Sequence, residues 1–266
     1  MAAIQSTRGF CWLELATTEL ARAQRYYDRI FDWQPRSLGL ATPAGAPIHY
    51  QCFWRGEHMV GGFYEHVRGS RASAVGAHWK GYVAVTDVEH TLWRAEELGA
   101  RVLAPPIDLS EFGRFALLAD PQHAPIGLWQ TCSGRHPGIG RGDMGLLRWM
   151  EYATPDPGAA ARFYEQLFGW QAREIALPAG PYHLLEHEGV QIGGLAGPAQ
   201  PHARGAAAWL PYFQVVDCAA LSERAANLLG ELVTPAARID GGPTYAVLRD
   251  PQRALFGLFT PAAPAP

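Results

Sequence analysis

The sequence predicts an α+β protein of two tandem domains, each built from two βαβββ units, and three observations support this fold class. The segment CWLELATTELARAQRYYDRIFDWQ, residues 11–34, recurs as RWMEYATPDPGAAARFYEQLFGWQ, residues 148–171. After each apolar strand-like segment comes a stretch with apolar residues at helical spacing. Short strands bounded by turn residues follow, so the order of one strand, one helix and three strands recurs four times.

The spacing of the repeat sets the expected domain limits. Trp12 and Glu14 recur as Trp149 and Glu151, an offset of 137 residues. Further on, FALLADPQHAPIGLW matches YAVLRDPQRALFGLF at an offset of 130, so one loop of the second half is shorter. We expect a first domain at 1–132, a glycine-rich linker at 133–145 and a second domain at 146–262.

Each unit contains signals for its elements in chain order. Its first strand corresponds to FCWLELAT, GYVAVTD, LLRWMEYAT or PYFQVVD. Asp156 followed by Pro157 is typical of a helix start, and Gly99 and Gly230 fall where two helices should end. The sequence DPQ, which begins at Asp120 and again at Asp250, predicts a hairpin turn before the last strand of each domain.

Charge and hydropathy argue against several classes of protein. The 266 residues carry a formal net charge of −3, with no basic run, so we expect no nucleic-acid partner. The sequence has no stretch of eighteen apolar residues, so no membrane-spanning helix is predicted. Because Glu14 and Glu19 interrupt the first twenty residues, no signal peptide is predicted and we expect a cytoplasmic protein.

The motifs, taken in order, resemble the vicinal oxygen chelate superfamily of glyoxalases, bleomycin-resistance proteins and extradiol dioxygenases. They are the paired βαβββ units, the aromatic helix ends at Tyr26–Trp33 and Phe163–Trp170, the V-x-D sequence and the DP turn. The tandem form with Trp-x-Glu looks most like the glyoxalase-like CFP-30B branch. The resemblance implies that each domain folds its strands into a cupped mixed sheet; it indicates the fold more specifically than the reaction.

The resemblance also implies four metal-ligand positions in each cup, and this sequence departs from the family at all of them. In the first domain these positions fall on Trp12, Lys80, Gly127 and a site near Gly62. In the second domain they fall on Trp149, Leu210, Gly257 and a site near Gly194. Divalent metals need imidazole, thiolate or carboxylate donors, so we expect neither a metal nor another cofactor.

Strand alternation predicts which side chains face each cup, because successive residues point to opposite sides of a sheet. We expect aromatic walls with a few polar groups, as in small-molecule sites, with the glycines leaving open space between them. The predicted ligand-binding residues are Trp12, Lys80, Tyr82 and Trp129 in the first cup, and Trp149, Tyr212, Gln214 and Phe259 in the second.

Glu14 and Glu151 are the candidate catalytic residues, and each has two interpretations. As a structural group, each carboxylate accepts hydrogen bonds from neighbouring strands, and Glu14 pairs with Lys80. As a functional group, each is a partly buried acid with a raised pKa that serves in proton transfer. We further expect residues 37–50 to form a loop over the first cup, and Trp33, Trp93 and Trp170 to lie in the core.

Two functions remain open at this point. The first is a metal-independent protein that sequesters or carries an aromatic or hydrophobic metabolite or toxic compound. The second is an acid–base enzyme, an isomerase, cyclase or lyase, that uses a cup glutamate. In either case the expected partner is a small organic molecule rather than nucleic acid or membrane. The fused repeat is compatible with a monomer or a homodimer.

Overall fold

The computed structural model describes residues 9–41, 47–66, 76–109, 112–132, 142–177 and 179–262. The first half contains two βαβββ units in succession, as predicted. They are β1 (Phe10–Thr17), α1 (Leu20–Phe31), β2 (Gln34–Ala41), β3 (Pro47–Arg55) and β4 (His58–Glu65), then β5 (His78–Ala84), α2 (Val88–Glu97), β6 (Arg101–Asp108), β7 (Arg114–Ala119) and β8 (Pro125–Gln130).

The second half repeats this order, and its connection to the last unit contains the short 3₁₀ helix η3 (Pro201–Ala203). Its elements are β9 (Leu147–Ala153), α3 (Pro157–Phe168), β10 (Gln171–Leu177), β11 (Gly180–His187) and β12 (Val190–Ala196), then β13 (Ala208–Gln214), α4 (Cys218–Asn227), β14 (Glu231–Arg238), β15 (Thr244–Arg249) and β16 (Leu255–Thr260).

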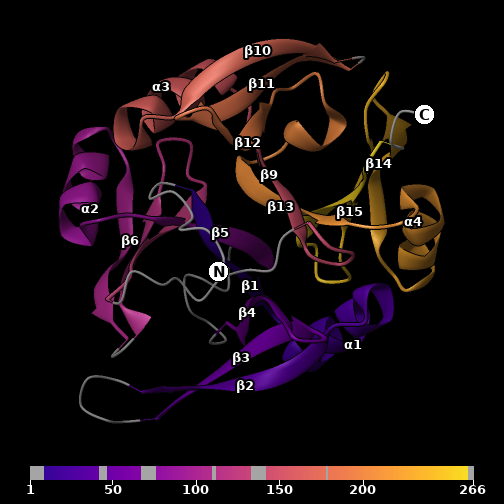
Figure 1. Cartoon of the computed structure of the whole chain (residues 1–266), viewed down its shortest axis with the longest axis horizontal. Helices are drawn as coiled ribbons and strands as arrows, with labels where there is room; N and C mark the ends of the chain where they lie inside the picture. The colour runs from indigo at the N-terminus through magenta and orange to yellow at the C-terminus, as the bar shows by residue number, and fades with distance from the viewer. Residues whose placement is uncertain are drawn as a thin grey trace.

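The strands form two eight-stranded mixed sheets with equivalent order. The first runs β2-β3-β4-β1-β5-β8-β7-β6 and the second β10-β11-β12-β9-β13-β16-β15-β14. In each sheet the strand that carries Trp-x-Glu lies at the centre, parallel to one neighbour and antiparallel to the other. Figure 1 shows α2 beside α3 on one side of the molecule and α1 beside α4 on the other.

Local sequence explains the helix positions. In α1 the buried residues are Ala23, Tyr26, Tyr27, Ile30 and Phe31, which form one apolar stripe. Helix α3 begins as predicted: the Asp156 side chain accepts a hydrogen bond from the Ala159 amide, and proline follows. It ends at Gly169, whose φ of 75° is the left-handed conformation that glycine adopts readily.

One large apolar core joins the two sheets. Phe10 of β1 contacts Trp170 and Trp209 of the second half, with ring centroids 5.6 and 4.9 Å apart. Trp33 and Trp170 are fully buried, as expected. The prediction for Trp93 is wrong, because it is 54% exposed while α2 buries Val88, Leu92 and Ala95 instead.

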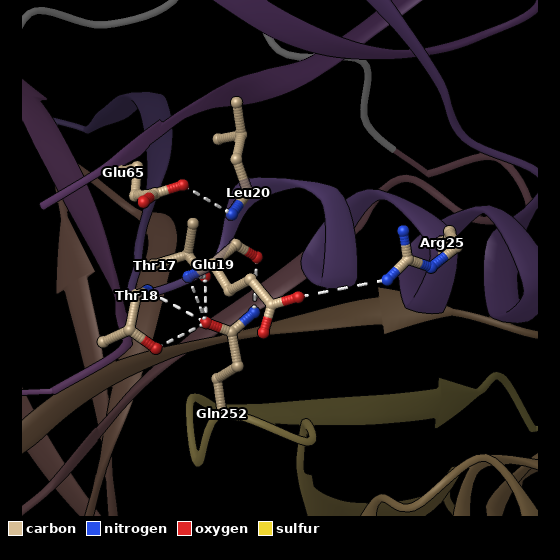
Figure 2. A network of polar contacts seen from close by, with 7 residues as sticks. All are labelled: Thr17, Thr18, Glu19, Leu20, Arg25, Glu65 and Gln252. Atoms are coloured by element: carbon tan, nitrogen blue, oxygen red, sulfur yellow. Dashed lines mark hydrogen bonds and ion pairs between the residues drawn. The ribbon is translucent and has the colours of Figure 1, made fainter.

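The DPQ turns also connect the halves. Figure 2 shows Gln252 beside the start of α1, where its Oε1 accepts hydrogen bonds from the Thr18 and Glu19 amides at 2.9 and 2.7 Å. The same oxygen accepts hydrogen bonds from the hydroxyl groups of Thr17 and Thr18, and Gln252 Nε2 donates to the Glu19 carbonyl. Glu19 is the N-cap of α1 but makes no side-chain cap of its own. A residue of the second half therefore satisfies amides at the start of a first-half helix.

The reciprocal contact has the same design. Gln122 accepts a hydrogen bond from the Thr154 hydroxyl at 2.6 Å and donates one to the Asp156 carbonyl at 2.9 Å. The Tyr164 hydroxyl donates to Asp120, just as Tyr27 donates to Asp250. We call these two contacts, at Gln252 and at Gln122, the DPQ clasps. The turns were predicted correctly, but their contact with the opposite half was not.

Candidate functional site

Each sheet curls around one cavity. Cup 1, of about 210 Å³, is lined by Glu14, the aromatic residues Trp12, Tyr50, Tyr82, Phe112, Phe115 and Trp129, and the aliphatic residues Leu38, Ile107 and Leu109. Cup 2, of about 270 Å³, is lined among others by Trp149, Glu151, Ile175, Tyr182, Gln200, His202, Tyr212, Tyr245 and Phe259. Both walls are rich in aromatic rings, as is typical of small-molecule sites, and cup 2 also contains the polar side chains of Arg148, Gln191, Gln200 and His202.

In cup 1 the carboxylate of Glu14 is held by three donors. Tyr50 and Tyr82 donate their hydroxyl hydrogens to its two oxygens at 2.6 and 2.7 Å. Lys80 Nζ lies 2.8 Å from Oε2, and both side chains of this ion pair are almost fully buried. Lys80 also donates to the Tyr64 hydroxyl at 2.8 Å. This arrangement supports the structural interpretation of Glu14.

The electrostatics of cup 1 agree with that geometry. Burial by itself would raise the pKa of Glu14, but the charge of Lys80 and three hydrogen bonds outweigh burial, so the pKa is lowered. The pKa of Lys80 is raised, because Glu14 and Tyr64 outweigh the opposing effect of burial. Burial and the charge of Glu14 raise the pKa of Tyr50 and Tyr82. At neutral pH cup 1 therefore contains a permanent ion pair and two protonated phenols.

In cup 2 the carboxylate has a different set of partners. His202 Nε2 lies 2.6 Å from Glu151 Oε1, and the Tyr212 hydroxyl donates to the same oxygen at 2.9 Å. The other ring nitrogen of His202 lies 3.0 Å from the Thr234 hydroxyl. Leu210, fully buried, stands where cup 1 has Lys80. The neighbour of this carboxylate is thus the imidazole of His202 rather than the ammonium group of a lysine.

Four glycines make room for the tyrosines. A Cβ at Gly62 would overlap the Tyr50 side chain, and one at Gly127 would overlap the Tyr82 ring. In the second half, Gly194 and Gly257 bear the same relation to Tyr182 and Tyr212. The expectation that these glycines open space for a ligand is therefore wrong. They let tyrosine rings cross the sheet surface, and in both cups at least one of those phenols donates to the central glutamate.

Most residues predicted from strand alternation lie where expected. Trp12, Glu14, Tyr82 and Trp129 line cup 1, and Trp149, Glu151, Tyr212 and Phe259 line cup 2. Lys80 does not line the cavity: it is buried and bound to Glu14.

Gln214 departs from the predicted pattern. The pairing of β13 with β9 shifts register between Tyr212 and Phe213, and Gln214 lines a groove beside α1 and α4 instead of cup 2. Residues 37–50, expected to be a loop, are largely the strands β2 and β3, from which Leu38 and Tyr50 reach cup 1. Residues 42–46 of this expected loop lie outside the described residues.

The sequence reading missed Tyr50, Tyr182 and His202. A signal for the two tyrosines is present: Cys52 pairs with Gly62 and Leu184 with Gly194, so each tyrosine lies two residues before the partner of an equivalent glycine. Aligning the two halves on those glycines would have placed the tyrosines at one repeated position. His202 lies on η3, which has no counterpart among the described residues of the first half.

The resemblance described above implies a metal at four positions of each cup, and the side chains present do not fit one. Trp12, Lys80, Leu210 and Trp149 supply no suitable donor, and the glycines lie under tyrosine rings. Glu14 is already bound to Lys80 and two phenols. Across the described part of the chain, no group of three or more His, Cys, Asp or Glu residues could hold a metal ion.

Comparison with known proteins agrees with the fold. Residues 146–258 match the model of the Glyoxalase/Bleomycin resistance protein/Dioxygenase superfamily. A protein of Mycobacterium tuberculosis, named as a candidate glyoxylase, CFP32, is 29% identical over 253 residues, 94% of each chain. The anthracycline biosynthesis protein DnrV of Streptomyces peucetius is 27% identical over 262 residues, covering 93% of this chain and 91% of DnrV.

Solved structures show the same architecture at low sequence identity. The Mn(II)-bound glyoxalase of Novosphingobium aromaticivorans superposes with a TM-score of 0.63 at 10% identity, covering 97% of this chain and 83% of the glyoxalase. The second half of the chain thus matches the superfamily that the motifs resemble, and the whole chain shares the fold of this glyoxalase. No helix in the described ranges is both long and apolar enough to span a membrane.

Proposed function

We propose that this chain is a metal-independent protein that binds an aromatic or hydrophobic organic molecule in its cups. The observation that carries the proposal is the wall of cup 2, a cavity of about 270 Å³ in which aromatic rings surround a glutamate held by its neighbours. Because the carboxylate is already hydrogen-bonded, it fixes the wall in place, and the rings supply flat apolar surface for a planar ligand.

The relatives are consistent with small-molecule metabolism. One carries a name from anthracycline biosynthesis and another a glyoxylase name. Anthracyclines contain fused aromatic rings, which is the kind of surface that cup 2 would accept. Binding of a compound to sequester or carry it needs no proton transfer and no metal.

The test is isothermal titration calorimetry, in which 2-naphthol is titrated into the protein. Leu38 of cup 1 and Ile175 of cup 2 are equivalent, partly buried wall residues, so Leu38→Trp and Ile175→Trp form a matched pair that fills one cup at a time. We expect each variant to lose binding in its own cup and the double variant to bind nothing. Binding that persists in the double variant, or no binding to the unmodified protein, would refute the proposal.

A second candidate function is supported by one specific contact. The 2.6 Å hydrogen bond between Glu151 and His202 lies in the wall of cup 2, and carboxylate–imidazole pairs can move protons in an isomerase, cyclase or lyase. Glu14 is the weaker candidate, because Lys80 holds it ionised. In the enzyme case Glu151→Gln abolishes turnover and preserves binding, while Glu14→Gln/Lys80→Leu, which removes both charges of the buried pair, preserves both. Turnover that survives Glu151→Gln would dismiss this candidate.

A further inference from the structure

Cup 2 has a basic side chain at its entrance, and the described wall of cup 1 has none. Arg148 and Gln191 line cup 2 and are exposed, whereas Glu151, at 5% exposure, lies deep in the same wall. The described wall of cup 1 consists of Glu14, aromatic rings and three aliphatic side chains. A ligand that enters cup 2 therefore meets a positive charge before it reaches the buried glutamate.

A β-bulge positions Arg148. Two successive residues of β13 pair with Trp149 and Leu147, so Arg148 of β9 is an extra residue between these pairs. Bulges are frequent beside binding sites, because they redirect a side chain. Here the guanidinium carbon lies over the ring of Phe259, 5.3 Å from its centroid, and Phe259 also lines cup 2. The bulge thus places the charge against the aromatic wall of the cavity.

The equivalent residue of cup 1 occupies the same bulge in different surroundings. Two successive residues of β5 pair with Phe10 and Trp12, so Cys11 is the extra residue of β1. Cys11 is 2% exposed, and its thiol donates to the Tyr82 carbonyl at 3.4 Å. The duplicated bulge therefore contains a small buried side chain in the first half and an exposed cation beside the cavity in the second.

Arg148 also differs from Arg173 and Arg253, two exposed arginines of the same half. Arg173 pairs with Glu186 at 3.0 Å, and Arg253 pairs with Glu231 at 3.1 Å. Arg148 has no acidic partner among the described residues, and its contact is with the Phe259 ring. Contact with a ring face leaves the five N–H donors of a guanidinium without an acceptor. These donors form a planar fork that matches the two oxygens of a carboxylate.

We propose that cup 2 binds an aromatic carboxylate, an inference that rests on the proposed binding function. The ring system packs against the aromatic wall, and the carboxylate accepts hydrogen bonds from Arg148 at the entrance. The reverse orientation would place two carboxylates side by side in a buried site, because Glu151 lies in the depth of the cup. Arg148 is therefore the residue that determines specificity for an anion and the orientation of the ligand.

The experiment compares 2-naphthoate with 2-naphthamide, two probes of similar shape of which only the first carries a charge at pH 7. In Leu38→Trp, which leaves cup 2 open, calorimetry should show about tenfold tighter binding of 2-naphthoate, since charge-assisted hydrogen bonds are the stronger ones. Adding Arg148→Gln should remove that preference. Adding Arg162→Gln instead should keep it, because this exposed arginine of α3 has the same charge and does not line cup 2.

Cup 1 provides a second control. In Ile175→Trp, which leaves cup 1 open, the two probes should bind without a preference for the anion, because the described wall offers no basic side chain. A preference of the same size in both cups would show that Arg148 does not select the carboxylate.

The remaining outcomes separate this inference from the binding function. If the two probes bind Leu38→Trp equally well, or if Arg162→Gln removes the preference as fully as Arg148→Gln, the role of Arg148 is wrong while binding stands. If neither these probes nor 2-naphthol binds the unmodified protein, the proposed function itself fails. Circular dichroism of each variant establishes that a lost preference does not come from unfolding.

Discussion

The two cups share one framework and differ in how they hold its central charge. In each cup a glutamate follows a tryptophan by two residues on the central strand. Tyrosine rings pack over glycines of the neighbouring strands in both cups. In cup 1 Lys80 neutralises Glu14 with a buried ion pair. In cup 2 Leu210 replaces the lysine, and His202 from η3 contacts Glu151 instead. Duplication has preserved the framework while the group beside the carboxylate has changed.

This difference separates structural from functional use of the same carboxylate. The ion pair with Lys80 and the hydrogen bonds from Tyr50 and Tyr82 keep Glu14 ionised and engaged, so this carboxylate is poorly suited to proton transfer at neutral pH. In cup 2 the neighbour of Glu151 is an imidazole, whose two ring nitrogens contact Glu151 and Thr234. Cup 2 is also the larger cavity. We therefore expect ligand chemistry to depend on cup 2 more than on cup 1.

Replacing Lys80 with leucine, the residue of cup 2, should have the largest effect. Glu14 would remain buried without its cation, and breaking a buried pair in this way typically costs about 3–5 kcal/mol of unfolding free energy. Guanidinium denaturation at pH 7 measures the loss. The double variant Glu14→Gln/Lys80→Leu removes both charges and should recover most of it. A Lys80→Leu protein as stable as the unmodified chain would mean that the ion pair does not hold cup 1 together.

Acid should destabilise the first half more than the second, through His78. Burial, opposed by a hydrogen bond to Gly76 and assisted by the charge of Lys80, lowers the pKa of His78 to about 4. The unfolded chain takes up this proton near its ordinary value of 6.5, so the contribution of His78 is fully present above pH 6.5. It is lost as the pH falls through about 4, where the loss amounts to about 3 kcal/mol.

The control variant is His78→Ala, which gives the first half the residue that the second half has at the equivalent position. The position equivalent to His78 is Ala208, since each pairs with an alanine of the central strand. Denaturation at pH 7, 5.5 and 4 should show a steeper loss for the unmodified protein than for His78→Ala. Parallel pH profiles for the two proteins would be inconsistent with a buried neutral histidine.

In cup 2, His202→Ala should cost about 1–3 kcal/mol, because Glu151 loses one hydrogen bond and keeps the one from Tyr212. Thr234→Val removes only the contact on the far side of the imidazole and should cost about 1 kcal/mol or less. Urea denaturation compares the two variants at constant pH. Equal losses would indicate that His202 contributes packing rather than support for the carboxylate.

Sequence reasoning predicted the fold well, because the evidence for it is repeated and periodic. Local patterns with direct physical causes predict four strand–helix–strand units, the helix start at Asp156–Pro157 and both DPQ turns. Strand alternation also placed Trp12 and Glu14 on the cavity side, because that periodicity is geometric.

The site residues that were missed depend on features without a local sequence pattern. Gln214 is the last residue of β13 and lines the groove beside α1 and α4, a position that alternation alone did not predict. His202 reaches Glu151 from an irregular connection, where no periodicity predicts direction. The glycines were correctly located but misinterpreted, because a missing side chain can admit a neighbour as easily as a ligand.

The smallest expected difference lies between the two DPQ clasps. Gln252 accepts hydrogen bonds from the Thr18 and Glu19 amides at the start of α1, whose N-cap residue makes no side-chain cap. Gln122 instead contacts the start of α3, which the Asp156 side chain already caps. We expect Gln252→Ala to cost about 1–2 kcal/mol and Gln122→Ala about 1 kcal/mol or less, since lost caps typically cost about 1 kcal/mol.

Thermal unfolding of both variants measures this difference. Hydrogen exchange at the Thr18 and Glu19 amides should rise only in Gln252→Ala, because of the two glutamines it is Gln252 that contacts these amides. Equal losses would mean that the clasps act only by joining the two halves. At the same end of α1, Glu65 of the first half accepts from the Leu20 amide. A larger loss for Gln122→Ala would contradict the view that the start of α1 also depends on Gln252, and would make α3 the more dependent helix.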